Sequence, residues 1–95
     1  MTSLDMLKYN LGKLDTAQDE YLRHLIEAAR QMIAREGIDL DSAPESEAQS
    51  IVTMYSAYLY RRRAGDDQSM PRMLRYALNN LLFAQKAAPD GGDAT

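Results

Sequence analysis

The chain has 95 residues, a net charge of −3 and no cysteine. This length makes one small domain with a modest core, and the lack of cysteine excludes disulfides and thiolate metal sites. No apolar run approaches the roughly 20 residues of a membrane span, and the N-terminus lacks a signal-peptide pattern. We therefore expect a soluble protein without a membrane partner, and the small acidic excess is atypical of a dedicated nucleic-acid binder.

Charge is distributed unevenly along the chain. Residues 1–50 contain five basic and ten acidic side chains, whereas residues 51–95 contain six basic and four acidic ones. An acidic half and a basic half suit head-to-tail association of identical chains, although a chance split over a small surface explains the charges equally well.

Two helices are expected in the first part of the chain. Ser3 can cap a short helix over residues 4–10, with Gly12 just past its end. Asp15 or Thr16 can cap a long helix over residues 17–36. Its core face repeats at spacings of three and four: Leu22, Leu25, Ile26, Ala29, Met32 and Ile33.

An acidic connection over residues 38–46 leads to a central helix over residues 47–64. Ser46 and Gln49 match the capping-box pattern at its start, and Gly65 can end it in a left-handed conformation. The apolar positions of this helix cover about 160° of its circumference, which is wider than contact with one neighbour requires. We expect it to pack on two or more sides, either against helices of its own chain alone or against these and a helix of another chain.

A last helix is expected over residues 71–86, with Pro71 near its first position. Its core face contains only Leu and Ala: Leu74, Ala77, Leu78, Leu81 and Leu82. Tyr76 and Phe83 lie on nearly the opposite side, flanked by Met73. This second apolar stripe makes either an additional core contact or a partner surface.

The predicted fold is therefore all-α: a small four-helix domain over residues 1–86, with a short N-terminal helix, followed by a disordered tail over residues 87–95. No sequence motif indicates an enzyme, a cofactor or a metal site. The single histidine, His24, has no ligand partner at helical spacing. Asp39 and Asp41 resemble the start of a calcium loop, but the sixth position is Pro44 and the twelfth is Ser50.

Arg61, Arg62 and Arg63 are the most conspicuous candidate site. They lie at the C-terminal end of the central helix, where the helix dipole stabilises positive charge. They also suit contact with an acidic partner surface or, less well, with phosphate. A helix-turn-helix, with the last helix contacting DNA, is a less suitable interpretation. The linker before that helix has roughly six residues, whereas the turn of the motif has three or four.

Two segments resemble the small head–tail connector proteins of tailed bacteriophages and prophages. These are residues 54–63 (MYSAYLYRRR) and residues 70–83 (MPRMLRYALNNLLF). The order of the elements over residues 3–86 is similar as well. No single residue of this family is diagnostic, because the family has no catalytic signature.

The resemblance implies a structural protein of the virion, assembled in the cytoplasm of a bacterial host. Such connectors form a ring beneath the portal protein, roughly twelve-fold, and several are monomers until they meet it. The ring extends the DNA channel and supports the next connector or a tail protein, while DNA passes through the lumen without sequence-specific binding. The alternatives are a small helical interaction module, which predicts a monomer or dimer, and a DNA-binding helical domain.

The residue-level interface hypothesis comes from this sequence alone. We expect Tyr60, Tyr76 and Phe83, with the neighbouring Met73, to meet another subunit or the portal. We expect Arg61 to Arg63 to face an acidic surface, whose obvious source is the acidic connection. Its candidate residues are Asp39, Asp41, Glu45 and Glu47.

Overall fold

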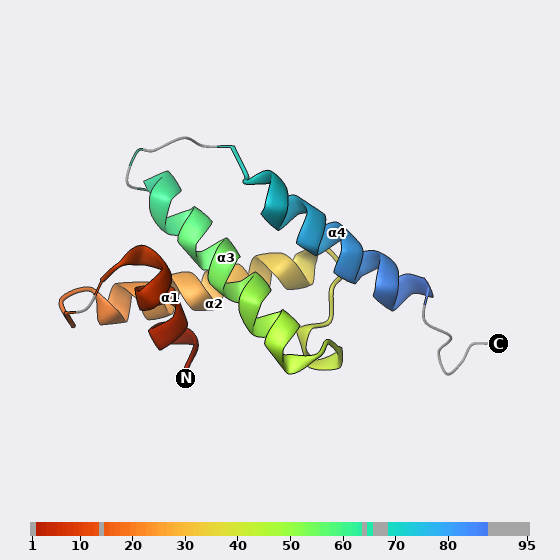
Figure 1. Ribbon diagram of the computed structural model, residues 1–95, viewed down its shortest axis with the longest axis horizontal. Helices are drawn as coiled ribbons and strands as arrows, with labels where there is room; N and C mark the ends of the chain where they lie inside the picture. The colour runs from red at the N-terminus through yellow and green to blue at the C-terminus, as the bar shows by residue number, and fades with distance from the viewer. Residues whose placement is uncertain (1, 14, 64, 66–68, 88–95) are drawn as a thin grey trace.

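The computed structural model describes residues 2–13, 15–63, 65 and 69–87 of the chain. Within them the elements are α1 (Ser3–Leu11), α2 (Asp19–Arg35), the 3-10 turn η1 (Leu40–Ser42), α3 (Glu45–Arg63) and α4 (Arg72–Ala87). These residues contain no strand, so the predicted all-α, four-helix fold is confirmed (Figure 1). Of the predicted tail, Ala87 closes α4 and residues 88–95 lie outside the described residues.

The starts of α1 and α3 differ from the expected ones. Thr2, not Ser3, caps α1: its side chain accepts the Asp5 N–H at 3.1 Å, and the Asp5 carboxylate accepts the Thr2 N–H at 3.4 Å. Helix α3 begins at Glu45, so Ser46 lies inside the helix and the predicted Ser46 cap is wrong. Here the Pro44 carbonyl already accepts the Ala48 N–H, because the fixed φ of proline suits a helix start.

Helix α2 begins two residues later than expected, at Asp19. The Asp15 side chain accepts the Ala17 N–H at 3.3 Å, which holds the preceding residues in a turn instead of capping the helix. The helix ends were predicted correctly at Gly12 and Gly65. Both have positive φ, 74° and 92°, the left-handed conformation in which glycine is not strained.

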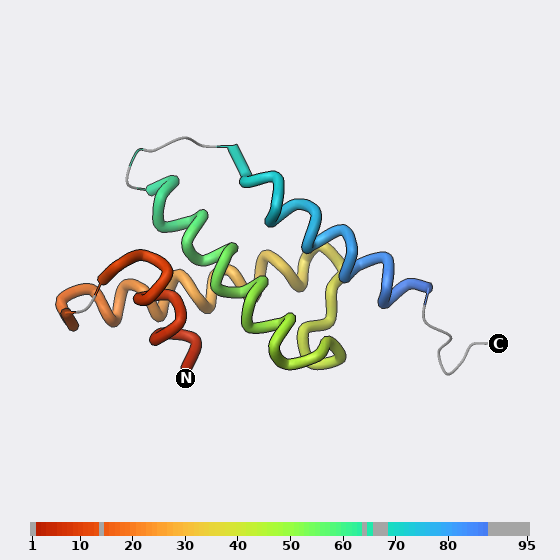
Figure 2. The backbone as a smooth tube through the Cα atoms, viewed as in Figure 1, coloured from red at the N-terminus to blue at the C-terminus, as the bar shows by residue number. Residues whose placement is uncertain are grey.

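Helix α3 is the centre of the domain, and it packs against α1, α2 and α4. In Figure 2 it runs diagonally, with α1 and the first half of α2 to one side and α4 along the other. Its buried side chains include small ones, Ser56 and Ala57, which let neighbouring helices approach closely. The expected packing of this helix on several sides within its own chain is confirmed. The core consists of Leu7, Leu22, Leu25, Ile26, Ala29, Ile33, Ile38, Ile51, Val52, Tyr55, Ala57, Leu59, Leu74, Leu78 and Leu81.

Two ion pairs join helices at their ends. Lys8 Nζ of α1 lies 2.8 Å from Asp19 Oδ1 at the start of α2. Arg75 Nη1 of α4 lies 3.3 Å from Glu36 Oε1, just after α2. The Arg75–Glu36 pair is substantially exposed and contributes little to stability. The Lys8–Asp19 pair is shorter and more shielded, with side chains 15% and 19% exposed, and it fixes the end of α1 against the start of α2.

Helix α4 is attached by one apolar face and one polar clamp. Leu74, Leu78 and Leu81 are buried. Near the other end of the helix, the Gln85 amide makes two hydrogen bonds to the backbone of Asp39: Oε1 accepts the N–H at 2.8 Å and Nε2 donates to the carbonyl at 2.7 Å. The clamp fixes α4 against the connection between α2 and α3.

We expect Gln85→Ala to lower the free energy of unfolding by about 1–2 kcal/mol, because both hydrogen bonds are lost while little apolar surface changes. Urea denaturation followed by circular dichroism measures the effect. Asn79→Ala, an exposed substitution on the same helix, serves as the control and should change stability by less than about 0.5 kcal/mol. Equal effects of the two substitutions would contradict a specific role of the clamp.

Tyr55 gives the fold a dependence on alkaline pH. Burial raises the pKa of its phenol above the ordinary value near 10, and Glu36 and Tyr58 raise it further. The folded state therefore prefers the neutral phenol. Its contribution to stability is complete below the unfolded pKa of about 10 and is lost as the pH rises through the folded value.

Thermal melts between about pH 9 and about pH 12 should show a steeper loss of stability for the wild type than for Tyr55→Phe. Tyr9→Phe, which alters a tyrosine that is 73% exposed, should leave the wild-type slope unchanged. Parallel curves for all three proteins would show that Tyr55 ionises as an ordinary surface phenol.

Candidate interaction surfaces

Met73, Tyr76 and Phe83 form an exposed surface on α4, which we call the aromatic face. Their side chains are 73%, 59% and 72% exposed, respectively. The opposite side of α4 supplies the core contacts through its leucines, so these three residues have no place in the core of this chain. Of the two expectations for the stripe, additional core contact is therefore wrong, and a surface available to a partner remains.

Tyr60 does not belong to this face. Its ring lies 6.2 Å from that of Tyr21 on α2, and its hydroxyl donates to Gln18 Oε1 at 3.1 Å. Lys13 Nζ lies 5.5 Å from the centre of the Tyr60 ring, and a hydrogen bond to Tyr60 raises the pKa of Lys13. Tyr60 therefore faces α2 and holds the start of that helix in position. The sequence-based expectation that it shares a surface with Tyr76 and Phe83 is wrong.

The arginine end consists of Arg61, Arg62 and Arg63, all exposed at the C-terminus of α3. Arg61 Nη2 donates to Asn10 Oδ1 of α1 at 3.3 Å. The guanidinium carbons of Arg62 and Arg63 lie 5.8 and 5.7 Å from the ring centres of two tyrosines. Aromatic faces thus steady the two guanidinium groups without neutralising them, and neither is in an ion pair with a residue of the described part.

The acidic end consists of Asp39, Asp41, Glu45 and Glu47, all exposed. The Asp39 carboxylate shapes the turn η1: it accepts the Asp41 N–H at 3.1 Å and the Ser42 hydroxyl at 2.7 Å. Asp41, Glu45 and Glu47 are in no ion pair within the described ranges. The acidic end therefore presents carboxylates at the start of α3, where the helix dipole stabilises negative charge.

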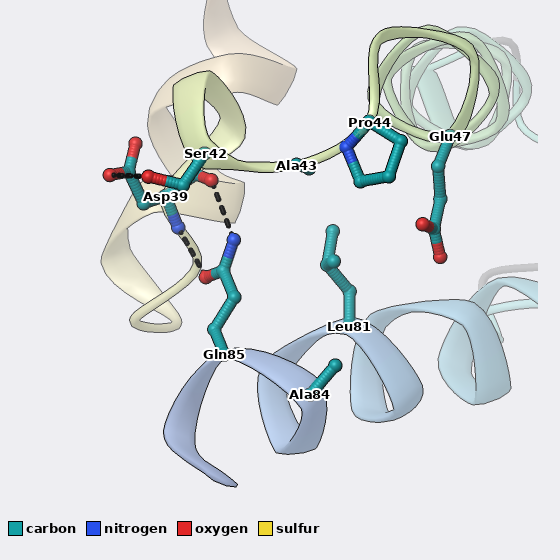
Figure 3. Close-up of a pocket in the computed structure, with 8 residues that line it drawn as sticks. All are labelled: Asp39, Ser42, Ala43, Pro44, Glu47, Leu81, Ala84 and Gln85. Atoms are coloured by element: carbon teal, nitrogen blue, oxygen red, sulfur yellow. Dashed lines mark hydrogen bonds between the residues drawn. The ribbon is translucent and has the colours of Figure 1, made fainter. Parts of the chain in front are cut away.

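A groove of about 540 Å³ runs between the acidic end and the second half of α4 (Figure 3). Its apolar part is formed by small or short side chains: Ala43, Pro44, Leu81 and Ala84. Asp39 lines one end, and Glu47 hangs from α3 towards α4 at the other. The sequence did not indicate this groove, because its two walls are about 40 residues apart and come together only through the packing of α4 on α3.

The acidic end and the arginine end lie at opposite ends of one helix. A rise of 1.5 Å per residue places Glu45 and Arg61 about 24 Å apart along the axis of α3. No side chain spans this distance, and a straight helix cannot bend to shorten it. The two ends suggested as complements by the sequence therefore cannot pair within one chain.

Within the described residues, no group of three His, Cys, Asp or Glu side chains is arranged to hold a metal ion. None of the helices there is sufficiently long and apolar to cross a membrane. Comparison of the chain with protein-family models, with curated proteins and with solved structures gives no match. The surfaces described above are thus the basis for inferring what the chain does.

Tyr76→Ala and Phe83→Ala should leave helicity unchanged and alter the free energy of unfolding by less than about 0.5 kcal/mol, because both side chains are exposed in the single chain. Leu78→Ala, on the buried side of the same helix, should cost about 2–5 kcal/mol. Helicity and the free energy of unfolding are compared by circular dichroism at a concentration where the protein is monomeric. A large loss of stability for Phe83→Ala would return this residue to the core.

Proposed function

We propose that this chain is a head–tail connector of a tailed phage or prophage, a structural protein without catalytic activity. In this proposal copies of the chain form a closed ring, roughly twelve-fold, beneath the portal protein. The ring joins the capsid to the next connector or to a tail protein and extends the DNA channel. The protein is made in the host cytoplasm and functions at the head–tail junction of the virion.

The observation that carries the proposal is the position of the two charged ends. Because they lie about 24 Å apart on a rigid helix, the carboxylates of the acidic end and the guanidinium groups of the arginine end pair only between two copies. A contact that joins different surfaces of identical chains is heterologous, and such contacts generate rings when the rotation closes. The resemblance of residues 54–63 and 70–83 to connector proteins supports the same assembly.

The shape of the charged ends supports a contact of this kind. The groove at the acidic end has apolar walls and the Glu47 carboxylate at one end, a combination that suits the aliphatic stem and the charged head of an arginine. The arginine end places its three side chains outward around the last turn of α3. One copy therefore offers the donor and the next copy the acceptor, and each copy carries both.

A DNA-binding domain is the competing hypothesis, with Arg72, Arg75 and Asn79 of α4 contacting the bases. Arg75 forms an ion pair with Glu36, so it is not available for base recognition without breaking that contact. Of these three residues only Arg72 and Asn79 remain available, and they lie beside the exposed apolar side chains of Met73 and Phe83. A small interaction module that stops at a monomer or dimer differs from the connector in its assembly alone.

The first experiment is a charge reversal with rescue. Arg62→Glu/Arg63→Glu should raise the protein concentration needed for assembly by roughly tenfold or more, because close charge pairs across an interface contribute at least about 1.4 kcal/mol. Adding Asp41→Arg/Glu45→Arg to the same chain should restore assembly. Light scattering, with and without the portal protein of the same phage or prophage, reports the mass at low salt.

The matched control is Arg23→Glu/Arg35→Glu, which changes the net charge equally on the exposed side of α2. It should leave assembly unaffected. If the control weakens assembly as much as the reversal of the arginine end, net charge rather than pairing governs association. A protein that remains monomeric with the portal and binds duplex DNA in a salt-dependent manner would replace the connector hypothesis by the DNA-binding one.

A further inference from the structure

The outward side of α4 has the residue spacing of a helix-pairing seam. Five exposed positions alternate at intervals of three and four along the helix, and we call them the α4 seam: Met73, Tyr76, Asn80, Phe83 and Ala87. This is the spacing with which one helix packs lengthwise against another. Since the leucines of α4 already contact the domain on the other side, the seam lacks a partner helix within the described part of the chain.

The charged residues of α4 itself are all positive, whereas Glu47 of α3 approaches the groove side of the helix near Ala84. Helix α4 contains three basic residues and no Asp or Glu. Arg72, Asn79 and Lys86 follow one another at intervals of seven and form an exposed row along one flank. The other flank carries Ala84, which is exposed and lines the groove, and Ala77, which is half-buried against the core.

We propose that the α4 seam binds an amphipathic helix of a second protein, one whose apolar stripe is flanked by Asp or Glu. The spacing of the seam suits a helix, and the row of Arg72 and Lys86 favours acidic residues beside the partner's stripe. Tyr76 and Phe83 supply most of the contact, because large aromatic side chains dominate the energetics of protein interfaces. The five seam residues are not part of the two charged ends, so the proposal stands whether or not the chain forms a ring.

A second copy of α4 fits the seam less well than an acidic helix. In an antiparallel pair, Arg72 of one copy lies beside Lys86 of the other, and the like charges repel. In a parallel pair, Arg72 and Lys86 are opposite the alanine flank and gain no acidic partner. Charge complementarity therefore selects a helix of different sequence.

The seam is ready to bind without rearrangement. Helix α4 is already formed and held against the domain by its buried leucines and by the bonds between Gln85 and the Asp39 backbone. Binding thus requires ordering only a few exposed side chains on this side of the complex, which lowers the entropic cost of association.

The test is a display selection on the full chain, with a library of helical peptides of roughly 18 residues. Each peptide has an apolar stripe at the heptad spacing, and each flanking position encodes Glu or Lys at equal frequency. We expect the selected peptides to favour Glu over Lys at least tenfold at the flanks. Against Arg72→Glu/Lys86→Glu, the same selection should favour Lys.

The individual binders then locate the surface. Phe83→Ala should weaken binding at least tenfold, as measured by fluorescence anisotropy. The control is Tyr9→Ala, which removes a strongly exposed aromatic side chain from α1 instead of α4. It should leave the affinity unchanged.

Four outcomes overturn the proposal. Selected peptides without a preference for Glu at the flanks would show that charge does not determine binding. Peptides whose affinity falls equally with Phe83→Ala and Tyr9→Ala would show non-specific binding to exposed aromatic residues. Loss of self-association on Phe83→Ala would assign the seam to a second copy of the chain. A duplex oligonucleotide that binds the wild type but not Arg72→Glu/Lys86→Glu would assign it to nucleic acid.

Discussion

The structure depends on the burial of α3 among the three other helices. A chain of this length buries only a modest fraction of its surface, and here most of that burial is organised around one helix. Ile51, Val52 and Leu59 supply apolar contacts on α3, while Ser56, which is fully buried, satisfies its hydroxyl by donating to the Val52 carbonyl at 2.7 Å. Helices packed in this way hold α3 straight, and a straight helix fixes the distance between its two charged ends.

This rigidity connects the fold to the proposed assembly. The side chains of Arg62 and Arg63 stand near tyrosine rings, and the Asp39 carboxylate is occupied in shaping η1. The charged groups are thus held outward by local contacts that leave their charges uncompensated within the described residues. In the proposed assembly these charges pair with those of neighbouring copies, which is the requirement for a heterologous ring.

Helix α4 combines two functions on opposite sides. Its leucine side contacts the domain, and its outward side presents aromatic and basic residues together. The clamp between Gln85 and Asp39 matters for both sides, because it fixes the orientation of α4 and closes one end of the groove beside the acidic end. Exposed Met, Tyr and Phe side chains cost solubility in a free chain, which favours the view that a partner covers them.

The sequence by itself determined the four helices, the leucine face of α4 and the left-handed glycine ends, because periodicity and turn chemistry are local. It misplaced the starts of α1, α2 and α3, because Thr2 caps α1, Asp15 forms a turn before α2, and α3 begins directly after Pro44. Only the tertiary structure decided that Tyr60 packs on Tyr21, that Phe83 remains exposed and that the α4 groove exists. Each of these depends on which helices meet, and helix contacts between distant segments leave no local pattern in the chain.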